Sequence, residues 1–383
     1  MRWRDFRRSA LERVRQAGRL GRWWLFGLWG FARPQRLRFR PPPWRRPSPL
    51  PAQPATITVP VARPVVYGSV LPEKFDDLPT HASGGEPGVT IADDVVLVPG
   101  HLFVDRRTAV VLPQSRGVII DQKALSGLRS RPPRVFRSPA EAEEVFVVDC
   151  YFTDNYGHNL LEALTRLMLL DKVPAGIEIA TSIPKSATVS ALFEGLGVAQ
   201  SRVRYYREPL FCRRAYLPDR LVYLEQFINP LARDAFARLA ALGSASRGER
   251  AERIFISRSR IRRRRLINEV EIETLFERYR FRIVHPETLP VEAQIALFSE
   301  AKMIAGLGGA AMHSTVFSRP ETRILMVSSR AWFMRTDVLI NEREGQLGYV
   351  FGEPEGVASG FGDWDWRVDP TAVEAAIVAH FGL

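Results

Sequence analysis

Residues 253–327 alternate between short apolar runs and longer amphipathic segments, and this alternation constrains the fold more than any other feature of the chain. Four aliphatic-rich runs begin at Arg253, Phe281, Lys302 and Thr322, with the sequences RIFIS, FRIV, KMIA and TRILMV. The segments between them carry apolar residues at helical spacing. Strands that alternate with helices of this length predict an α/β fold with a parallel sheet and right-handed crossovers.

A glycine-rich turn lies at the end of the third of these strands. Gly306, Gly308 and Gly309 precede a helix that is predicted to begin near Ala310. Glycine lets the backbone come close to a ligand, and the free amides and dipole of a helix N-terminus attract an anion. The turn, with Ala310, is therefore predicted to bind a phosphate group.

The excess positive charge is confined to one end of the chain. The 383 residues carry 54 basic and 42 acidic side chains, a net charge of +12. Residues 1–46 hold 14 arginines, no lysine and two acids, and subtracting these from the totals leaves 40 basic and 40 acidic side chains elsewhere. This distribution argues against nucleic-acid binding by the rest of the chain.

Residues 1–33 combine arginines with tryptophans and other apolar side chains. The apolar run from Trp23 to Ala32 is ten residues long. A helix of that length rises only about 15 Å, against about 30 Å of hydrocarbon, so the run should not cross a bilayer. Interfacial tryptophans and arginines instead predict a peripheral contact with an anionic membrane surface, at its cytoplasmic face. The alternatives are a basic tail without fixed structure and a targeting segment or short signal anchor.

The domain organisation is predicted from changes in composition. Residues 34–64 contain ten prolines and are expected to form an extended linker. Residues 65–243 are then expected to form an N-terminal domain, and residues 244–369 a second, Rossmann-like domain that opens with a polar hinge. Residues 370–383 are expected to form a C-terminal helix.

A second informative stretch follows the strand predicted at residues 145–152. A helix through residues 158–168 would place His158, Glu162 and Arg166 within one arc and leucines on the opposite side. Either this arc is a solvated face with an i,i+4 pair, or it is a functional site, because open α/β sheets bind ligands just beyond their strands. In a site, Glu162 would orient the imidazole of His158 and raise its basicity.

Several separated blocks resemble glycosyltransferase family 61. They are NYGHNLLEALTRL, IFISRSRIRRRRLINEVEI and RFRIVHPETLPVEAQIALFSEAKMIAGLGGAAMHSTVF, and they fall in order within residues 145–327. The resemblance implies a GT-B-like fold, in which two Rossmann-like domains face a cleft. It also implies inverting transfer of a sugar from a nucleotide-sugar donor, expected to be UDP-linked, to a glycan or polysaccharide hydroxyl, as in bacterial capsular polysaccharide and exopolysaccharide synthesis.

The resemblance also implies roles for individual residues. His158 and Glu162 match the histidine and the acidic residue of the family's first motif, in the acceptor-side domain. The donor-binding residues that it implies are Arg258, Asn268, Glu269, Glu287 and Gln294. Asn155 and Arg166 are predicted to lie on the acceptor side. Helix capping is the alternative role for Asn268 and Glu269, and Gln294 could equally be a surface residue.

The last block departs from the family pattern. Gly308-Gly309-Ala310-Ala311 stands where many members carry His-Gly-Ala-Gly, and Ser314 stands where an Asn or His is common. Either His313 supplies a shifted imidazole at the donor site, or the site has lost one. The second case keeps open a catalytically impaired scaffold protein of polysaccharide assembly as the alternative function.

Sugar transfer requires that charge on the leaving diphosphate be neutralised. Arg258, with Arg264 or Arg265, is predicted to do this together with the glycine turn, without a metal ion or another cofactor. Asp363 and Asp365 have the acid-x-acid spacing of metal-dependent transferases, but they follow the last predicted strand and are not expected to bind metal. The two cysteines give neither a zinc spacing nor a disulfide framework.

The general base is predicted to be His158, with Glu162 as the alternative. Glu287 is expected to bind the nucleotide or the sugar instead. A dinucleotide-dependent oxidoreductase is a third candidate function, but its fingerprint needs a further glycine three residues after the second, where this chain has Met312.

Overall fold

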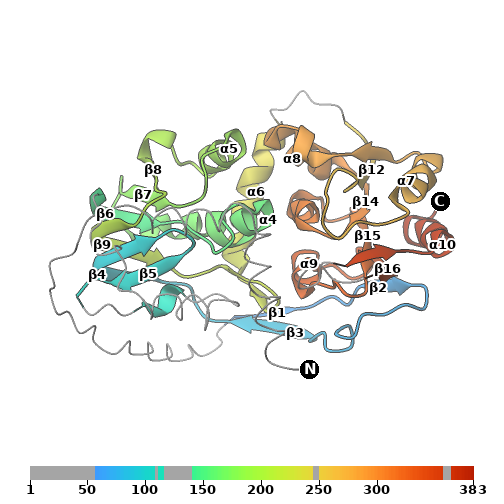
Figure 1. Cartoon of the computed structure of the whole chain (residues 1–383), viewed down its shortest axis with the longest axis horizontal. Helices are drawn as coiled ribbons and strands as arrows, with labels where there is room; N and C mark the ends of the chain where they lie inside the picture. The colour runs from blue at the N-terminus through green and yellow to red at the C-terminus, as the bar shows by residue number, and fades with distance from the viewer. Residues whose placement is uncertain (1–56, 108–110, 116–139, 245–249, 357–363) are drawn as a thin grey trace, which may run out of the picture.

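The structure, a computed structural model, describes residues 57–107, 111–115, 140–244, 250–356 and 364–383. The predicted membrane-contact segment 1–33 and most of the predicted linker 34–64 lie outside these residues. Figure 1 shows two sheets side by side, each with helices packed against it. Within the described ranges, every helix is too short or too polar to cross a membrane.

The first half is built on a six-stranded mixed sheet with the order β5-β4-β9-β6-β7-β8. β9, β6, β7 and β8 are parallel, whereas β4 pairs in antiparallel fashion with β5 and β9. The strands are β4 (Val89–Val98), β5 (Leu102–Asp105), β6 (Ala140–Val147), β7 (Glu178–Thr181), β8 (Val203–Tyr205) and β9 (Leu210–Pro218).

The helices of the first half cover this sheet and reach toward the second half. They are η1 (Pro113–Ser115), α4 (Tyr156–His158), the π-helical turn η3 (Asn159–Ala163), the 3₁₀ segment η4 (Leu164–Lys172), α5 (Ala187–Gly195), η5 (Gln200–Arg202) and α6 (Pro230–Ser244). A short hairpin of β10 (Val222–Tyr223) and β11 (Phe227–Ile228) precedes α6.

The second half is built on a seven-stranded sheet with the order β13-β12-β14-β15-β16-β17, in which β2 also pairs with β16. All its pairings are parallel except that of β16 with β17, so the predicted parallel sheet is confirmed. The strands are β2 (Val65–Tyr67), β12 (Arg253–Ile256), β13 (Arg282–Val284), β14 (Met303–Leu307), β15 (Arg323–Ser329), β16 (Leu347–Glu355) and β17 (Asp365–Arg367). The helices are α7 (Glu269–Arg278), η6 (Pro286–Thr288), α8 (Val291–Glu300), η7 (Ala310–Phe317), α9 (Arg335–Ile340) and α10 (Pro370–Phe381).

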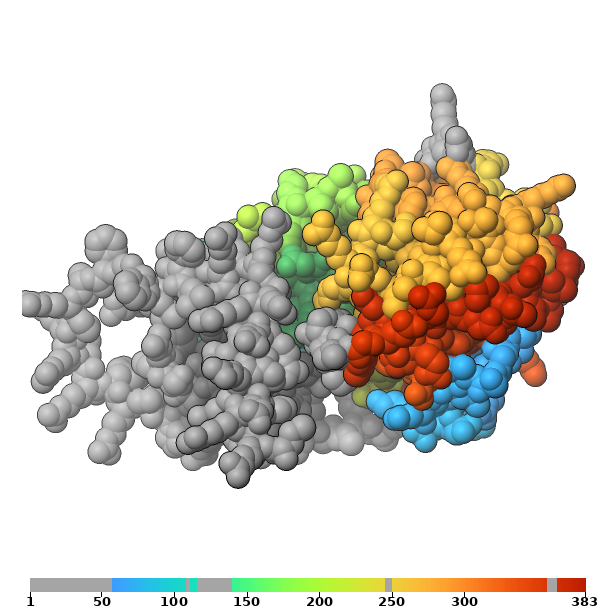
Figure 2. Space-filling view, turned by 45° about the vertical axis from the view of Figure 1, so that its right-hand side comes forward, coloured from blue at the N-terminus to red at the C-terminus, as the bar shows by residue number. Residues whose placement is uncertain are grey.

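The residues before β4 differ from the sequence-based expectation. β1 (Ile57–Pro60) lies inside the predicted linker and pairs with β3 (His81–Gly84). β2, expected to open the first domain, is instead the parallel neighbour of β16 in the second sheet. Figure 2 shows this part of the chain, in blue, against the C-terminal residues in red. The chain therefore contributes to the second sheet before it forms the first.

The two halves share one apolar core. A single cluster contains Phe146 and Phe236 of the first half together with Ile254 and Ile295 of the second. Across the boundary, α6 packs against α8, and a Cβ at Gly243 would lie 2.8 Å from the backbone nitrogen of Ala296. Only glycine allows α6 and α8 to pack this closely. Their contact joins the two halves on this side of the molecule (Figure 1).

Candidate active site

Each sheet contains one point at which the direction of strand addition reverses. In the first sheet, the chain runs from β6 outward through β7 to β8 and returns to β9 on the other side of β6. In the second sheet, it runs from β12 to β13 and returns to β14 on the other side of β12. Open α/β sheets bind ligands beyond the carboxyl ends of the strands at such points. Most of the predicted site residues follow β6, β12 and β14, whereas Glu287 and Gln294 come after β13.

In the first half, α4 presents His158 beyond the carboxyl end of β6. Asn155 begins the helix, and its side-chain oxygen accepts hydrogen bonds from the backbone nitrogens of Gly157 (2.9 Å) and His158 (3.4 Å). This is an N-cap, so the structure gives Asn155 a local role that explains the start of the helix.

His158 and Glu162 form the side-chain pair that the i,i+4 spacing predicts. Nδ1 of His158 lies 2.5 Å from Oε2 of Glu162, and the two side chains are 21% and 10% exposed. With Glu162 ionised, the hydrogen bond places the ring proton on Nδ1 and leaves the lone pair of Nε2 to accept another proton. The pair is therefore arranged as an oriented base.

Arg220 is a site residue that sequence analysis missed. Its Nη1 lies 3.8 Å from Oε1 of Glu162, on the side of the carboxylate opposite His158, and its side chain is 12% exposed. Arg220 follows β9, the parallel neighbour of β6, by two residues. The sequence indicates that Arg220 follows a strand. Its proximity to Glu162, however, depends on the pairing of β9 with β6, which the sequence does not show.

Arg166 lies in the interior rather than on a face open to an acceptor. It is 2% exposed and donates hydrogen bonds to the carbonyl oxygens of Glu162 and Pro218, each at 2.9 Å. Nη2 of Arg166 also lies 3.3 Å from Nε2 of the buried His101. Burial, and next the charge of Arg220, lowers the pKa of Arg166 to about 10. Arg166 therefore fixes the segment that carries Glu162 against the end of β9.

In the second half, the predicted glycine turn at the end of β14 packs closely against neighbouring residues. A Cβ at Gly309 would lie 2.1 Å from Nη1 of Arg258, and one at Gly308 would lie 2.7 Å from Oγ of Ser328. A Cβ at Gly306 would meet Sδ of Met312 at 2.5 Å. η7 then begins at Ala310, as predicted, although it is 3₁₀-helical. The turn therefore packs tightly against side chains of its own half, and Arg258 lies directly against Gly309.

A buried carboxylate holds the loop that carries Arg258. Oε1 of Glu269 accepts hydrogen bonds from Oγ of Ser257 (3.0 Å) and from the backbone nitrogen of Arg258 (2.6 Å). Burial raises the pKa of Glu269, and burial lowers the pKa of Arg258. Glu269 therefore positions the strand end rather than facing a ligand itself.

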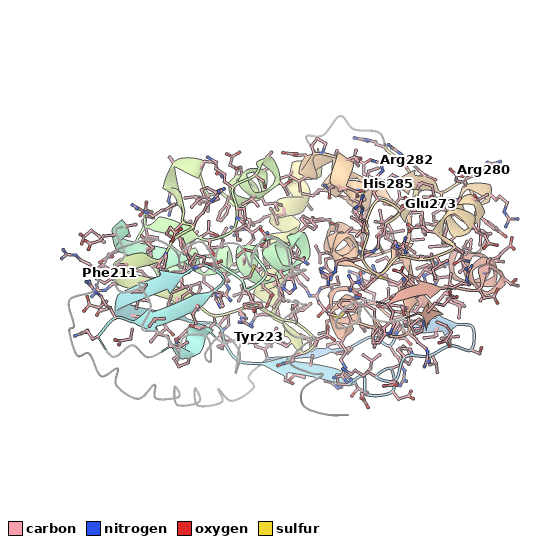
Figure 3. All side chains as sticks on the ribbon, viewed as in Figure 1. Phe211, Tyr223, Glu273, Arg280, Arg282 and His285 are labelled. Atoms are coloured by element: carbon pink, nitrogen blue, oxygen red, sulfur yellow. The ribbon has the colours of Figure 1, made fainter. Side chains whose placement is uncertain are left out.

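The other predicted donor-binding residues are spread over the rim of this half. The guanidinium of Arg264 lies 3.6 Å over the ring of Trp332, whereas Arg265 pairs with Asp365 at 2.6 Å. The remaining three make other contacts, and the charge of Glu287 also acts on Arg258. Asn268 donates to the carbonyl of Val368 and to Glu271, Gln294 donates to the carbonyl of Leu289, and the exposed Glu287 lies 4.0 Å from His285. Figure 3 labels His285 in this half, well away from Tyr223 of the first half.

The expected capping role of Asn268 differs in detail. Its side chain makes no hydrogen bond to the backbone nitrogens that open α7, although it bonds the side chain of Glu271 three residues later. It instead accepts from the backbone nitrogen of Val368 at 3.4 Å. Asn268 thus ties the start of α7 to the segment between β17 and α10.

The two halves meet where α4 packs on η7. A Cβ at Gly157 would lie 2.2 Å from Nδ1 of His313, and the hydroxyl of Tyr156 lies 3.0 Å from that of Ser314. Nε2 of His313 lies 3.4 Å from Oδ1 of Asp337. The helix that carries His158 and the helix that follows the glycine turn are therefore in direct contact, and His313 lies in that contact.

Two further features bear on the location of the site. Among the residues that the structure describes, no group of three or more His, Cys, Asp or Glu side chains is placed to hold a metal ion.

A pocket of about 480 Å³, lined among others by Arg323, Arg343 and His380, lies where β15 and β16 begin. That is the amino-terminal edge of the second sheet, opposite the edge at which open α/β sheets bind their ligands.

These features define an α/β protein whose two sheets bring an imidazole–carboxylate pair and an arginine-flanked glycine turn to neighbouring helices. The family model for glycosyltransferase 61 matches residues 156–325, which include both of these elements. For these residues the match confirms the family that the motifs predicted. A search of curated proteins finds no match to the chain.

Proposed function

We propose that the protein is an inverting glycosyltransferase that works without a metal ion. It would transfer a sugar from a nucleotide-sugar donor, UDP-linked, to a hydroxyl of a glycan or polysaccharide acceptor. The observation that carries this proposal is the contact of α4 with η7, because it joins His158 and the Arg258–Gly309 turn from positions far apart in the chain.

The donor half would stabilise the leaving group. The diphosphate would lie against the backbone amides around Gly309 and Ala310 and accept hydrogen bonds from the guanidinium of Arg258. Charge-assisted bonds of this kind act where negative charge develops in the transition state. Trp332 and Arg264, stacked at the rim of the same half, would border the nucleoside.

The acceptor half would remove the proton. The acceptor oxygen attacks the anomeric carbon, the bond from that carbon to the phosphate oxygen breaks, and its electron pair stays on the diphosphate. The hydroxyl proton passes to Nε2 of His158, and Glu162 stabilises the imidazolium through Nδ1. Arg220 would hold the carboxylate of Glu162 from the side opposite His158. Attack from the face opposite the leaving group inverts the anomeric configuration.

The broader assignments are part of the same proposal. The two halves would be the lobes of a GT-B-like fold, divided near residue 243, and the reaction would take place between them. Residues 1–33 would hold the enzyme at an anionic membrane surface on the cytoplasmic side, where bacterial capsular polysaccharide or exopolysaccharide is assembled. The confinement of the net charge to residues 1–46 supports this placement.

The proposal is tested by donor hydrolysis. The full chain is incubated with UDP-glucose, UDP-galactose, UDP-N-acetylglucosamine and UDP-xylose, with and without EDTA, and UDP release is measured by chromatography. We expect one donor to be hydrolysed at an EDTA-independent rate, and the first sugar released to have the inverted anomeric configuration by proton NMR. Absence of hydrolysis with every donor would favour the scaffold function, and loss of activity with EDTA would contradict the metal-independent mechanism.

A further inference from the structure

The exposed aromatic side chains gather around the His158–Glu162 pair. Among the described residues, the large apolar side chains that are exposed include three aromatic ones, which are Tyr151 (39%), Phe152 (37%) and Tyr223 (39%). The others are aliphatic and include Val270 on α7, at 73%. Single exposed aliphatic residues are common on protein surfaces, whereas a group of exposed aromatic rings beside polar residues marks a ligand-binding surface.

Two of the three aromatic residues lie between β6 and α4. The ring centroids of Tyr151 and Phe152 are 4.7 Å apart at an interplanar angle of 79°. The ring of Phe152 also lies 4.7 Å from the imidazole of His158, tilted by 49°. The aromatic surface is therefore continuous with the imidazole that is proposed to accept the proton.

Tyr223 comes from a different element. It lies on β10, which packs against η3, the turn that carries Glu162. Tyr223 is also close enough to Arg220 for the charge of that residue to act on it. Figure 3 labels Tyr223 in the first half of the molecule, below α4. Aromatic rings thus border the His158–Glu162 pair from two separate elements.

We propose that Tyr151 and Phe152, with Tyr223 at the side, form a stacking surface for a pyranose ring of the acceptor glycan. This inference rests on the proposed function and adds the acceptor subsite to it. The C–H groups on one face of a pyranose are weakly positive and pack against the negative face of an aromatic ring. A sugar ring held on Phe152 would bring its hydroxyl groups beside His158, where one of them loses its proton.

The position of these residues explains why the stacking surface belongs to the acceptor. The diphosphate is assigned to the Arg258–Gly309 turn in the other half, and the base must lie next to the acceptor hydroxyl. The side chain of Phe152 has no polar atom, and yet part of its apolar surface is exposed to water. A sugar ring would cover this surface in the bound state.

The test is direct binding of simple sugars to the full chain. The probes are methyl β-D-glucopyranoside, methyl β-D-galactopyranoside and methyl β-D-xylopyranoside, and binding is followed by saturation-transfer NMR with irradiation of aromatic protons. Phe152→Leu removes the ring but keeps an apolar side chain, and Phe152→Tyr keeps the ring. Val270→Ala is the control for an exposed apolar residue elsewhere, and thermal melting verifies that each variant is folded.

We expect at least one glycoside to bind the wild type, and its Kd to rise about fivefold in Phe152→Leu. The Kd should stay within about twofold of wild type in Phe152→Tyr and in Val270→Ala. Equal binding to Phe152→Leu and wild type, or no binding of any glycoside to the wild type, would overturn the stacking surface. UDP release from the donor is measured separately, so that failure of the stacking surface and failure of the transferase function are distinguished.

Discussion

The candidate sites in the two halves of the molecule differ in what they are built from. At the switch point of the second sheet, the candidate site consists of backbone and one arginine, because Gly306, Gly308 and Gly309 pack closely against their neighbours. At the switch point of the first sheet, it consists of side chains, with His158, Glu162 and Arg220 in one row. The same topology therefore places a glycine turn beside an arginine in one half and a histidine–carboxylate pair in the other.

The difference indicates which substitutions each half can accept. A site built from backbone depends on the close approach of the ligand to the main chain. Added side-chain atoms should therefore impair such a site more than the loss of a charged side chain at the rim. A side-chain site depends on a chain of hydrogen bonds, so a single change of protonation or length should disable it.

Replacement of His158 should have the largest effect. His158→Ala removes the proposed base, and kcat for transfer should fall by roughly 10²–10⁴-fold with little change in the KM of the donor. Glu162→Gln keeps the size of the side chain but loses the charge that holds the imidazole, and should lower kcat less. Steady-state kinetics with the hydrolysed donor measure both. A His158→Ala enzyme with normal kcat would remove His158 from the mechanism.

Replacement of Arg258 should act on the donor half. Arg258→Met should lower kcat/KM by roughly 10²–10³-fold, because the guanidinium stabilises charge on the leaving diphosphate. Arg258→Lys should recover only part of this loss, since an ammonium group cannot make two parallel hydrogen bonds. Arg265→Met is the matched control, because Arg265 is paired with Asp365 at the rim. Equal losses in the two variants would show that only the general positive charge matters.

The first half also carries a buried acid that should make its stability depend on pH. Asp149 follows β6, is 0% exposed, and accepts hydrogen bonds from Ser182 (2.8 Å) and Tyr206 (2.6 Å). Burial raises the pKa of Asp149 from 3.8 to about 6. The folded state thus holds a proton that the unfolded state loses. The stability that this provides is complete below pH 3.8 and is lost as the pH rises through 6.

Asp149→Asn should remove this dependence. The unfolding free energy of the variant, relative to wild type, should increase by up to about 3 kcal/mol between pH 4 and pH 7. Urea denaturation at a series of pH values measures the difference, and Asp93→Asn, at an exposed acid on β4, serves as the control. A difference that stays constant with pH would show that Asp149 titrates alike in the folded and unfolded states.

The smallest effect is expected from Gly309→Ala. The new Cβ would meet Nη1 of Arg258 at 2.1 Å, but this is the end of a flexible side chain that can move aside. The KM of the donor should rise about three- to tenfold, well below the loss in Arg258→Met. In the double variant the two effects should not add, because both act through the same guanidinium. Additive losses would show that Gly309 and Arg258 serve separate contacts.

Much of the second half could be predicted from the sequence. The runs at Arg253, Lys302 and Thr322 became β12, β14 and β15, because buried parallel strands need continuous apolar residues and the helices between them keep a regular period. β2 could not be predicted, since a three-residue strand has no period and its pairing with β16 is set by residues nearly three hundred positions away.

The site was predictable where it depended on local geometry. His158 and Glu162 are four residues apart, and their contact survives although the chain turns from α-helix to π-helix between them. The position of Arg166 was not predictable from a helical wheel, which assumes a constant rotation per residue. The π-turn η3 and the 3₁₀ segment η4 change the rotation per residue, and residues 159–167 are all buried. The assignments of residues 1–33 lie outside the described residues and stay predictions.

A crystal structure of the full chain with bound UDP would show where the diphosphate lies. We expect the diphosphate within hydrogen-bond distance of the Arg258 guanidinium and of the amides around Gly309, with its terminal phosphate toward His158. A diphosphate bound elsewhere, such as in the pocket lined by Arg323 and Arg343 at the opposite edge of the sheet, would contradict it.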